Sequence, residues 1–171
     1  MASWREGEAN RQRVDRYVDV LLEEPAAADV AWLASLTGDL PRARHELRLL
    51  RCAMGVLVAE QDALADRTAA DVVRQLGLPI RVGQPERREG WARRWREYAE
   101  ASSRRGTSDV VSHRLARVLL SSAGHRAPAA EDVLAAAVRI ADLRTALNEA
   151  LRSIVGQVRL PDDIQPSAIG R

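Results

Sequence analysis

The stretch LPRARHELRLLRCAMGVLVAEQDALA, residues 40–65, decides the fold of this chain. Read as a helix, it carries a column of residues at alternating spacings of three and four, the pattern of a heptad seam: Leu40, Ala43, Leu47, Leu50, Met54, Leu57, Gln61 and Leu64. A second apolar column consists of Leu49, Cys52, Val56 and Ala59. A helix that is apolar on more than one side must be surrounded by other helices or by a partner chain. The sequence leaves both arrangements of the seam open.

Gly55 lies inside this stretch, in line with a polar stripe of Arg44, Arg48 and Arg51. A glycine inside a helix costs about 1 kcal/mol relative to alanine, so it usually has a packing reason. We therefore expect another segment to approach the helix closely at Gly55.

Helical spacing of apolar residues continues on both sides of this stretch. Proline and glycine punctuation divides the remainder into further predicted helices over residues 4–24, 29–36, 66–76, 86–103, 109–122 and 129–155. Gly77 is expected to end the fourth helix, and PIRV, residues 79–82, to form a short strand or an extended arm. The predicted fold class is all-α: a single-domain helical bundle of six or seven helices at 1–156, followed by an extended C-terminal arm at 157–171.

Composition restricts the class of protein. A length of 171 residues with 46% hydrophobic and 29% charged residues is typical of one globular domain with its own core. The longest central apolar run, CAMGVLVA at 52–59, is far shorter than the roughly 18–20 residues that span a bilayer. The first residues lack the apolar segment of a signal peptide, and one cysteine forms no internal disulfide. These features predict a soluble, cytoplasmic protein with no membrane partner.

The basic residues are all arginine, yet the net charge is only +2. A net charge of this size does not indicate a nucleic-acid binder by itself. A GC-rich bacterial genome accounts for the absence of lysine, and selection for guanidinium groups that bind phosphates or carboxylates is the alternative interpretation.

Residue types that carry catalysis are scarce and badly spaced. The three histidines, His45, His113 and His125, form no metal-ligand spacing with each other or with Cys52, and the chain has no glycine-rich phosphate loop. We therefore expect no catalytic residue, no metal and no cofactor. A pocket for a small molecule near His45, Cys52 and Gln61 is the remaining hypothesis for chemistry inside the bundle.

Residues 85–106, PERREGWARRWREYAEASSRRG, form the most unusual surface candidate. On a helix, Trp91 and Trp95 share one face, and Arg88 lies one turn before Trp91. The segment from 81 to 105 contains eight arginines and four glutamates, a local charge of +4. Either the tryptophans pack against the bundle, or the segment binds nucleic acid or a protein partner through its aromatic and basic residues: Arg87, Arg88, Trp91, Arg94 and Trp95.

The preceding segment TAADVVRQLGLP, residues 68–79, resembles the first helix and turn of bacterial helix-turn-helix regulators. The positions that match the family pattern are Val72, Val73, Leu76, Gly77 and Leu78. The resemblance covers about a dozen residues and implies a turn at Gly77, followed by a recognition helix. Val73 stands where a small alanine is usual, and Pro79, Gly83 and Pro85 occupy the start of the implied recognition helix. The alternative function is thus a DNA-binding regulator that uses a degenerate helix-turn-helix and the Arg/Trp-rich helix at 68–105.

The primary hypothesis is a non-enzymatic protein-interaction module: an adaptor, accessory or assembly subunit. It acts on a protein partner or forms a homo-oligomer through helix packing, with the seam at 40–64 as one surface. The C-terminal arm contributes apolar anchors set between polar residues, as a docking arm would: Leu160, Ile164 and Ile169.

Overall fold

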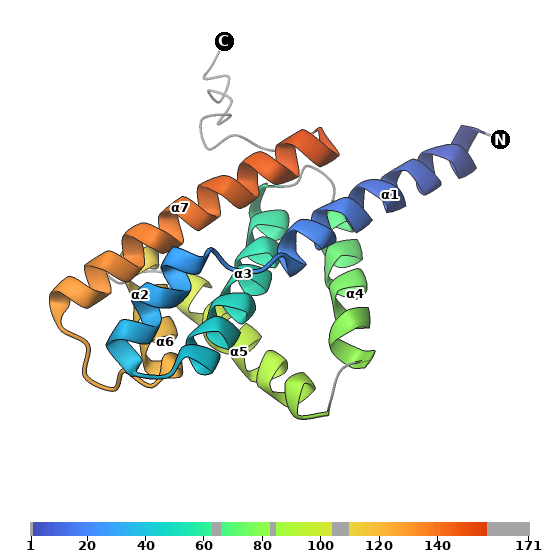
Figure 1. The fold of residues 1–171 in the computed structure, drawn as a ribbon. Helices are drawn as coiled ribbons and strands as arrows, with labels where there is room; N and C mark the ends of the chain where they lie inside the picture. Colours follow the sequence, from blue (N-terminus) through green and yellow to red (C-terminus); the bar gives the residue numbers. More distant parts are fainter. Residues whose placement is uncertain (1, 63–65, 83–84, 104–109, 157–171) are drawn as a thin grey trace, which may run out of the picture.

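The computed structural model describes residues 2–62, 66–82, 85–103 and 110–156. These ranges hold seven helices and no strand, which confirms the predicted all-α class (Figure 1): α1 (Ala2–Leu22), α2 (Ala27–Thr37), α3 (Leu40–Asp62), α4 (Asp66–Val82), α5 (Pro85–Ser103), α6 (Val111–Ala123) and α7 (Ala130–Val155). None of the described helices is long and apolar enough to cross a bilayer. The predicted arm at 157–171, with its three apolar anchors, lies outside the described residues.

Helix α3 lies at the centre of the bundle, and all six other helices contact it (Figure 1). Every residue from Cys52 to Ala59 is buried, so this part of α3 has no face toward solvent. The described members of the heptad seam between Ala43 and Leu57 are buried by the chain itself. The seam is therefore internal, whereas the sequence also left open that a second copy covers it.

Helix α1 crosses α3 closely at Gly55, as the sequence predicted. The Tyr17 hydroxyl donates a hydrogen bond to the Gly55 carbonyl at 3.1 Å. A Cβ placed on Gly55 would lie 2.1 Å from Cδ2 of Leu21, far inside van der Waals contact. One turn earlier on α3, the buried Cys52 thiol lies 3.5 Å from the Leu21 carbonyl. Burial raises the pKa of this thiol to about 12, so Cys52 is a core residue and not a nucleophile at neutral pH.

Arginines from neighbouring helices bind the carboxyl ends of three helices that have no basic residue in their own last turn. Arg51 donates to the Val20 carbonyl of α1 at 2.9 Å, and Arg114 donates to the Ala101 carbonyl of α5 at 2.7 Å. Arg42 donates twice to the Ser122 carbonyl of α6, at 2.9 and 2.6 Å. The last carbonyls of a helix carry partial negative charge, so each guanidinium both satisfies an acceptor and neutralises a helix end.

Helix α4 departs from the predicted boundaries because it continues through Gly77 and Pro79 to Val82. The expected stop at Gly77 and the expected strand or arm at 79–82 are therefore wrong. Val72 and Leu76 are completely buried on the side of α4 that contacts α1 and α3. Packing of this face compensates for the low helix propensity of glycine and for the hydrogen bond that proline removes. The turn that the helix-turn-helix resemblance implied at Gly77 is helix instead.

Two glycine substitutions should have opposite effects on the free energy of unfolding, because only one of the glycines lies at the α1–α3 crossing. Gly55→Ala should lower the free energy of unfolding by about 1–3 kcal/mol, because Leu21 is buried and must shift to admit the methyl group. Gly90→Ala is the matched control in α5, where an added Cβ meets nothing within 4 Å. That control should raise stability by up to about 1 kcal/mol through helix propensity. Urea denaturation followed by circular dichroism measures both, and a stabilising Gly55→Ala would contradict the crossing geometry.

Candidate functional site

The Arg/Trp-rich helix α5 packs against the bundle through its aromatic residues. Trp91 and Trp95 are half-buried against the core, with ring centroids 6.2 Å apart in a stacked arrangement. Tyr98 is completely buried, and burial raises the pKa of its hydroxyl above the usual range. These contacts match the packing interpretation of the tryptophans. The side chains of Arg87 and Arg88 lie outside the described residues.

Arg94, the third arginine proposed for partner binding, is a buried member of an ion pair between α5 and α3. It is 8% exposed and donates to both carboxylate oxygens of Glu46, from Nε at 2.8 Å and from Nη2 at 2.9 Å. Its Nη1 donates to Glu97 at 2.6 Å. Arg94 therefore joins two helices instead of facing a ligand, and its removal would leave the Glu46 charge buried without a partner.

The residues considered for a small-molecule pocket do not converge. His45 is exposed at one end of α3, and Cys52 faces α1. Gln61 is exposed near the other end of α3, where it donates to Ser102 at 3.4 Å and accepts from Arg144 at 3.0 Å. The three positions span more than four turns of one helix, so they cannot share one small cavity. In the described part of the chain, no group of three histidines, cysteines or carboxylates could hold a metal ion.

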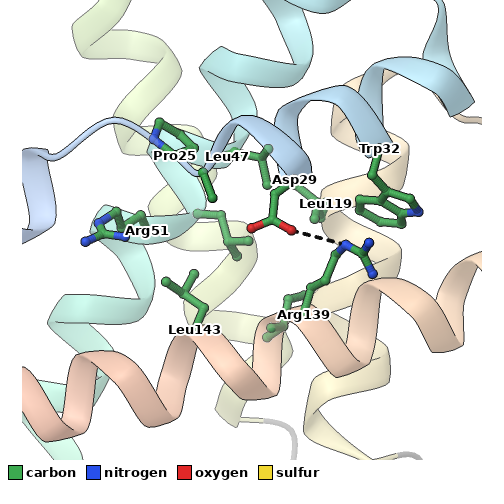
Figure 2. Close-up of a pocket in the computed structure, with 11 residues that line it drawn as sticks. Pro25, Asp29, Trp32, Leu47, Arg51, Leu119, Arg139 and Leu143 are labelled. Carbon is green, nitrogen blue, oxygen red and sulfur yellow. Dashed lines mark ion pairs between the residues drawn. The ribbon is translucent and has the colours of Figure 1, made fainter.

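A different pocket, between α2, α3, α6 and α7, has the features of a binding site (Figure 2). It encloses about 90 Å³. Apolar side chains from three helices form its floor: Leu47, Leu50, Leu119, Ile140 and Leu143. The other lining residues, which we call the rim, are Pro25, Ala26, Asp29, Trp32, Arg51 and Arg139. An apolar floor combined with a few polar groups is the usual composition of a ligand site.

The rim contains an incompletely satisfied arginine. The Nε atom of Arg139 lies 3.2 Å from Oδ1 of Asp29, and the guanidinium lies over the Trp32 ring at 4.3 Å from the centroid. Figure 2 shows the Asp29 carboxylate and the Arg139 guanidinium facing each other beside the indole. The ion pair lacks hydrogen-bond alignment, and Nε of Arg139 is buried with no acceptor among the described residues. A buried donor without an acceptor costs free energy, so an added acceptor would be stabilised here.

The local sequence explains how these rim residues are placed. Pro25 lies in the connection between the end of α1 at Leu22 and α2, and Asp29 lies in the first turn of α2, where the helix dipole favours a carboxylate. Trp32 lies three residues later on the same side of α2. On the opposite wall, the Arg51 side chain is 18% exposed and is held by the Val20 carbonyl and by Glu23, whose carboxylate lies 2.6 Å from Nη2.

Sequence reasoning missed this pocket because Arg139 fits the polar face of α7 as well as any other charged residue. The position of Arg139 relative to the apolar residues of α7 is the sequence feature that distinguishes it. Arg139 has Ala136 three residues before it and Leu143 four residues after it, both of which belong to the apolar face. An arginine within an apolar column covers hydrophobic surface with its stem and carries its charge to the edge of that surface.

A second depression, between α3, α5 and α6, is open and strongly basic. It encloses about 510 Å³ and is lined by Arg42, Arg93, Arg94, Glu97, Arg117, Val118, Ser121 and Ser122. Arg93 is exposed and has no ion-pair partner among the described residues. Arg42 and Arg94 already bind the Ser122 carbonyl and Glu46, respectively. We call this depression the basic cleft.

Comparison of the chain with protein-family models, with curated proteins and with solved structures gives no match in any of the three.

The buried pair of Glu46 and Arg94 predicts strong non-additivity. Arg94→Met should lower the free energy of unfolding by about 3–5 kcal/mol, because Glu46 stays buried without a counter-charge. The double substitution Glu46→Leu with Arg94→Met should recover most of this loss. Arg93→Met, at the exposed neighbouring position, is the control and should change stability by about 0.5 kcal/mol or less. Equal denaturation midpoints for Arg94→Met and Arg93→Met would contradict the structural role of Arg94.

Proposed function

We propose that this chain is a non-enzymatic helical protein-interaction module, an adaptor, accessory or assembly subunit. Its pocket between α2, α3, α6 and α7 receives one aliphatic side chain from a partner segment that also carries a carboxylate. The observation that carries this proposal is the unsatisfied Nε donor of Arg139 at the edge of an apolar floor.

The dimensions and chemistry of the pocket support this class of ligand. A volume of about 90 Å³ is smaller than the roughly 150 Å³ of a cavity that binds benzene, so it suits a single aliphatic side chain. Burial of one leucine or isoleucine side chain contributes about 1.5–3 kcal/mol. A hydrogen bond from a guanidinium to a carboxylate contributes about 1.5–3 kcal/mol more.

One pocket of this size gives weak affinity, so the module needs further contacts. Leu134 and Val138 provide apolar surface one turn apart on α7, at 55% and 52% exposure. They lie on the same helix as Arg139. A partner that follows α7 would add this surface to the contact in the pocket, which is how adaptors gain affinity from several weak sites.

Selection from a random peptide library tests the proposal. Peptides selected on the whole protein should share an aliphatic residue next to aspartate or glutamate. Their affinity should fall about tenfold in Arg139→Gln, because the substitution removes a charge-assisted hydrogen bond. Arg152→Gln, in the exposed last turn of the same helix, is the control and should bind like the wild type. Selected peptides without an acidic residue, or equal affinity for both variants, would contradict the proposal.

The second candidate function is nucleic-acid binding, and the basic cleft is the observation that favours it. Four arginines and one glutamate line the cleft, and three helices contribute them. Guanidinium groups match phosphate geometry, and an open cleft gives a sugar-phosphate backbone room to approach. Arg93, which is exposed, is therefore the arginine that would bind a phosphate, whereas Arg94 is committed to Glu46.

The salt dependence of binding to a short single-stranded oligonucleotide distinguishes this candidate. If phosphates bind in the cleft, affinity should fall steeply with salt, and Arg93→Gln should reduce the log–log slope by roughly 1. The matched control is Arg11→Gln, at an exposed arginine of α1. No binding at low salt, or the same slope for both variants, excludes the cleft as a nucleic-acid site.

A further inference from the structure

We propose that residues 157–171 of the chain itself occupy the pocket, with Ile164 against the apolar floor and Asp163 beside Arg139. This inference rests on the proposed function of the pocket. It adds that the module carries its own competitor for the partner segment, so that a partner must displace the arm to bind.

The chain after α7 is long enough for Ile164 to reach the pocket. The pocket residue Leu143 lies twelve residues before Val155, the last residue of α7, or about 18 Å along the helix axis. An extended chain of nine residues from Val155 to Ile164 spans at most about 32 Å. The five residues to Leu160 span at most about 18 Å, which leaves no length for the turn at Gly156 or for the lateral distance from α7 to the pocket. Ile164 is thus the first apolar residue of the arm that can return to the floor.

Helix α7 ends in a cap that redirects the chain. Gly156 adopts a left-handed conformation with φ of +79°, and its N–H donates to the Arg152 carbonyl at 2.9 Å. This cap ends the helix and turns the chain away from the helix axis. A return of the following residues along the bundle would require such a turn.

The sequence around Ile164 matches the chemistry of the pocket. The arm contains LPDDIQP at 160–166, in which Ile164 follows Asp162 and Asp163 directly. This is an aliphatic residue beside carboxylates, the chemistry that the pocket favours. Arg51 is already paired with Glu23, so the group of the pocket that an acid of this segment would meet is Arg139, whose Nε has no aligned acceptor among the described residues.

The prolines that flank this segment reduce the entropic cost of ordering it. Leu160 and Gln165 each precede a proline, a position that is restricted to extended conformations. A segment that is already restricted in the unbound chain loses less conformational freedom when it docks. Ile169 lies beyond the second proline and has no adjacent acid, so it does not meet the same requirements.

A spin label on the arm of the full chain tests the inference. Ser167→Cys introduces a thiol three residues from Ile164, and the buried Cys52 should remain unlabelled because its pKa is about 12. The label should broaden the indole N–H signal of Trp32, which lines the pocket, much more than the signals of Trp91 and Trp95 on α5. Ile164→Ser should restore the Trp32 signal, and the control Ile169→Ser should not.

A mixed sample determines which molecule supplies the arm. Labelled chains without isotope enrichment are combined with enriched chains without a label, and the Trp32 signal of the enriched chains should stay sharp. Broadening in this sample would show that a second copy supplies the arm and would overturn docking within one chain. A sharp Trp32 signal in the labelled full chain, or equal effects of Ile164→Ser and Ile169→Ser, would overturn the inference as well.

Peptide affinity separates this inference from the proposed function. An arm with a dissociation constant of ~0.1 mM, at an effective concentration of ~1 mM, weakens binding of a competing peptide about tenfold. The selected acidic peptides should therefore bind Ile164→Ser about tenfold more tightly than the wild type. If they bind both proteins equally, the pocket keeps its proposed function and the arm is not its occupant. If no acidic peptide binds either protein, the proposed function fails together with this inference.

Discussion

The close crossing of α1 over α3 at Gly55 is the contact on which the rest of the structure depends. The glycine lets Leu21 lie where a side chain would otherwise be, and Tyr17 secures the contact through the Gly55 carbonyl. This contact positions the carboxyl end of α1, where the Val20 carbonyl accepts a hydrogen bond from Arg51 of α3. Arg51 in turn forms one wall of the pocket. A single missing Cβ in the central helix thus sets where the chain leaves α1 and enters α2.

Arginine side chains form many of the polar contacts between the helices of this bundle. A guanidinium carries five donors in a planar arrangement, so it can bind a helix end or a carboxylate while its stem covers apolar surface. Arg42, Arg51 and Arg114 bind the carboxyl ends of neighbouring helices, and Arg94 joins α5 to α3. An arginine-rich composition therefore has a structural use here that is independent of phosphates. Only the arginines left outside these contacts, such as Arg93, are candidates for an external ligand.

The pocket differs from the other arginine contacts because its polar groups are not completely satisfied. Arg94 has hydrogen bonds to two carboxylates, whereas Arg139 has a poorly aligned ion pair and a stacked indole. Most buried donors in folded proteins have an acceptor, so the unsatisfied Nε of Arg139 at the edge of an apolar cavity is the feature that supports the proposed contact with a carboxylate. The same chemistry recurs in the arm, where acidic residues precede an isoleucine. If residues 157–171 compete for the pocket, only a partner segment of higher effective affinity would displace them.

The sequence by itself determined the helical class, the central place of α3 and the need for a close approach at Gly55. These properties follow from local periodicity, which is the same whichever helices are neighbours. Only the tertiary structure decided that the seam is covered by the chain itself, that α4 continues past Gly77, and that Arg94 is buried while Arg93 is not. It also decided that Arg139 meets Asp29 and Trp32 across helices that are distant in the sequence. The sequence does not distinguish an arginine that faces water from one that faces a carboxylate or a cavity. The environment of the side chain depends on which helix packs against it.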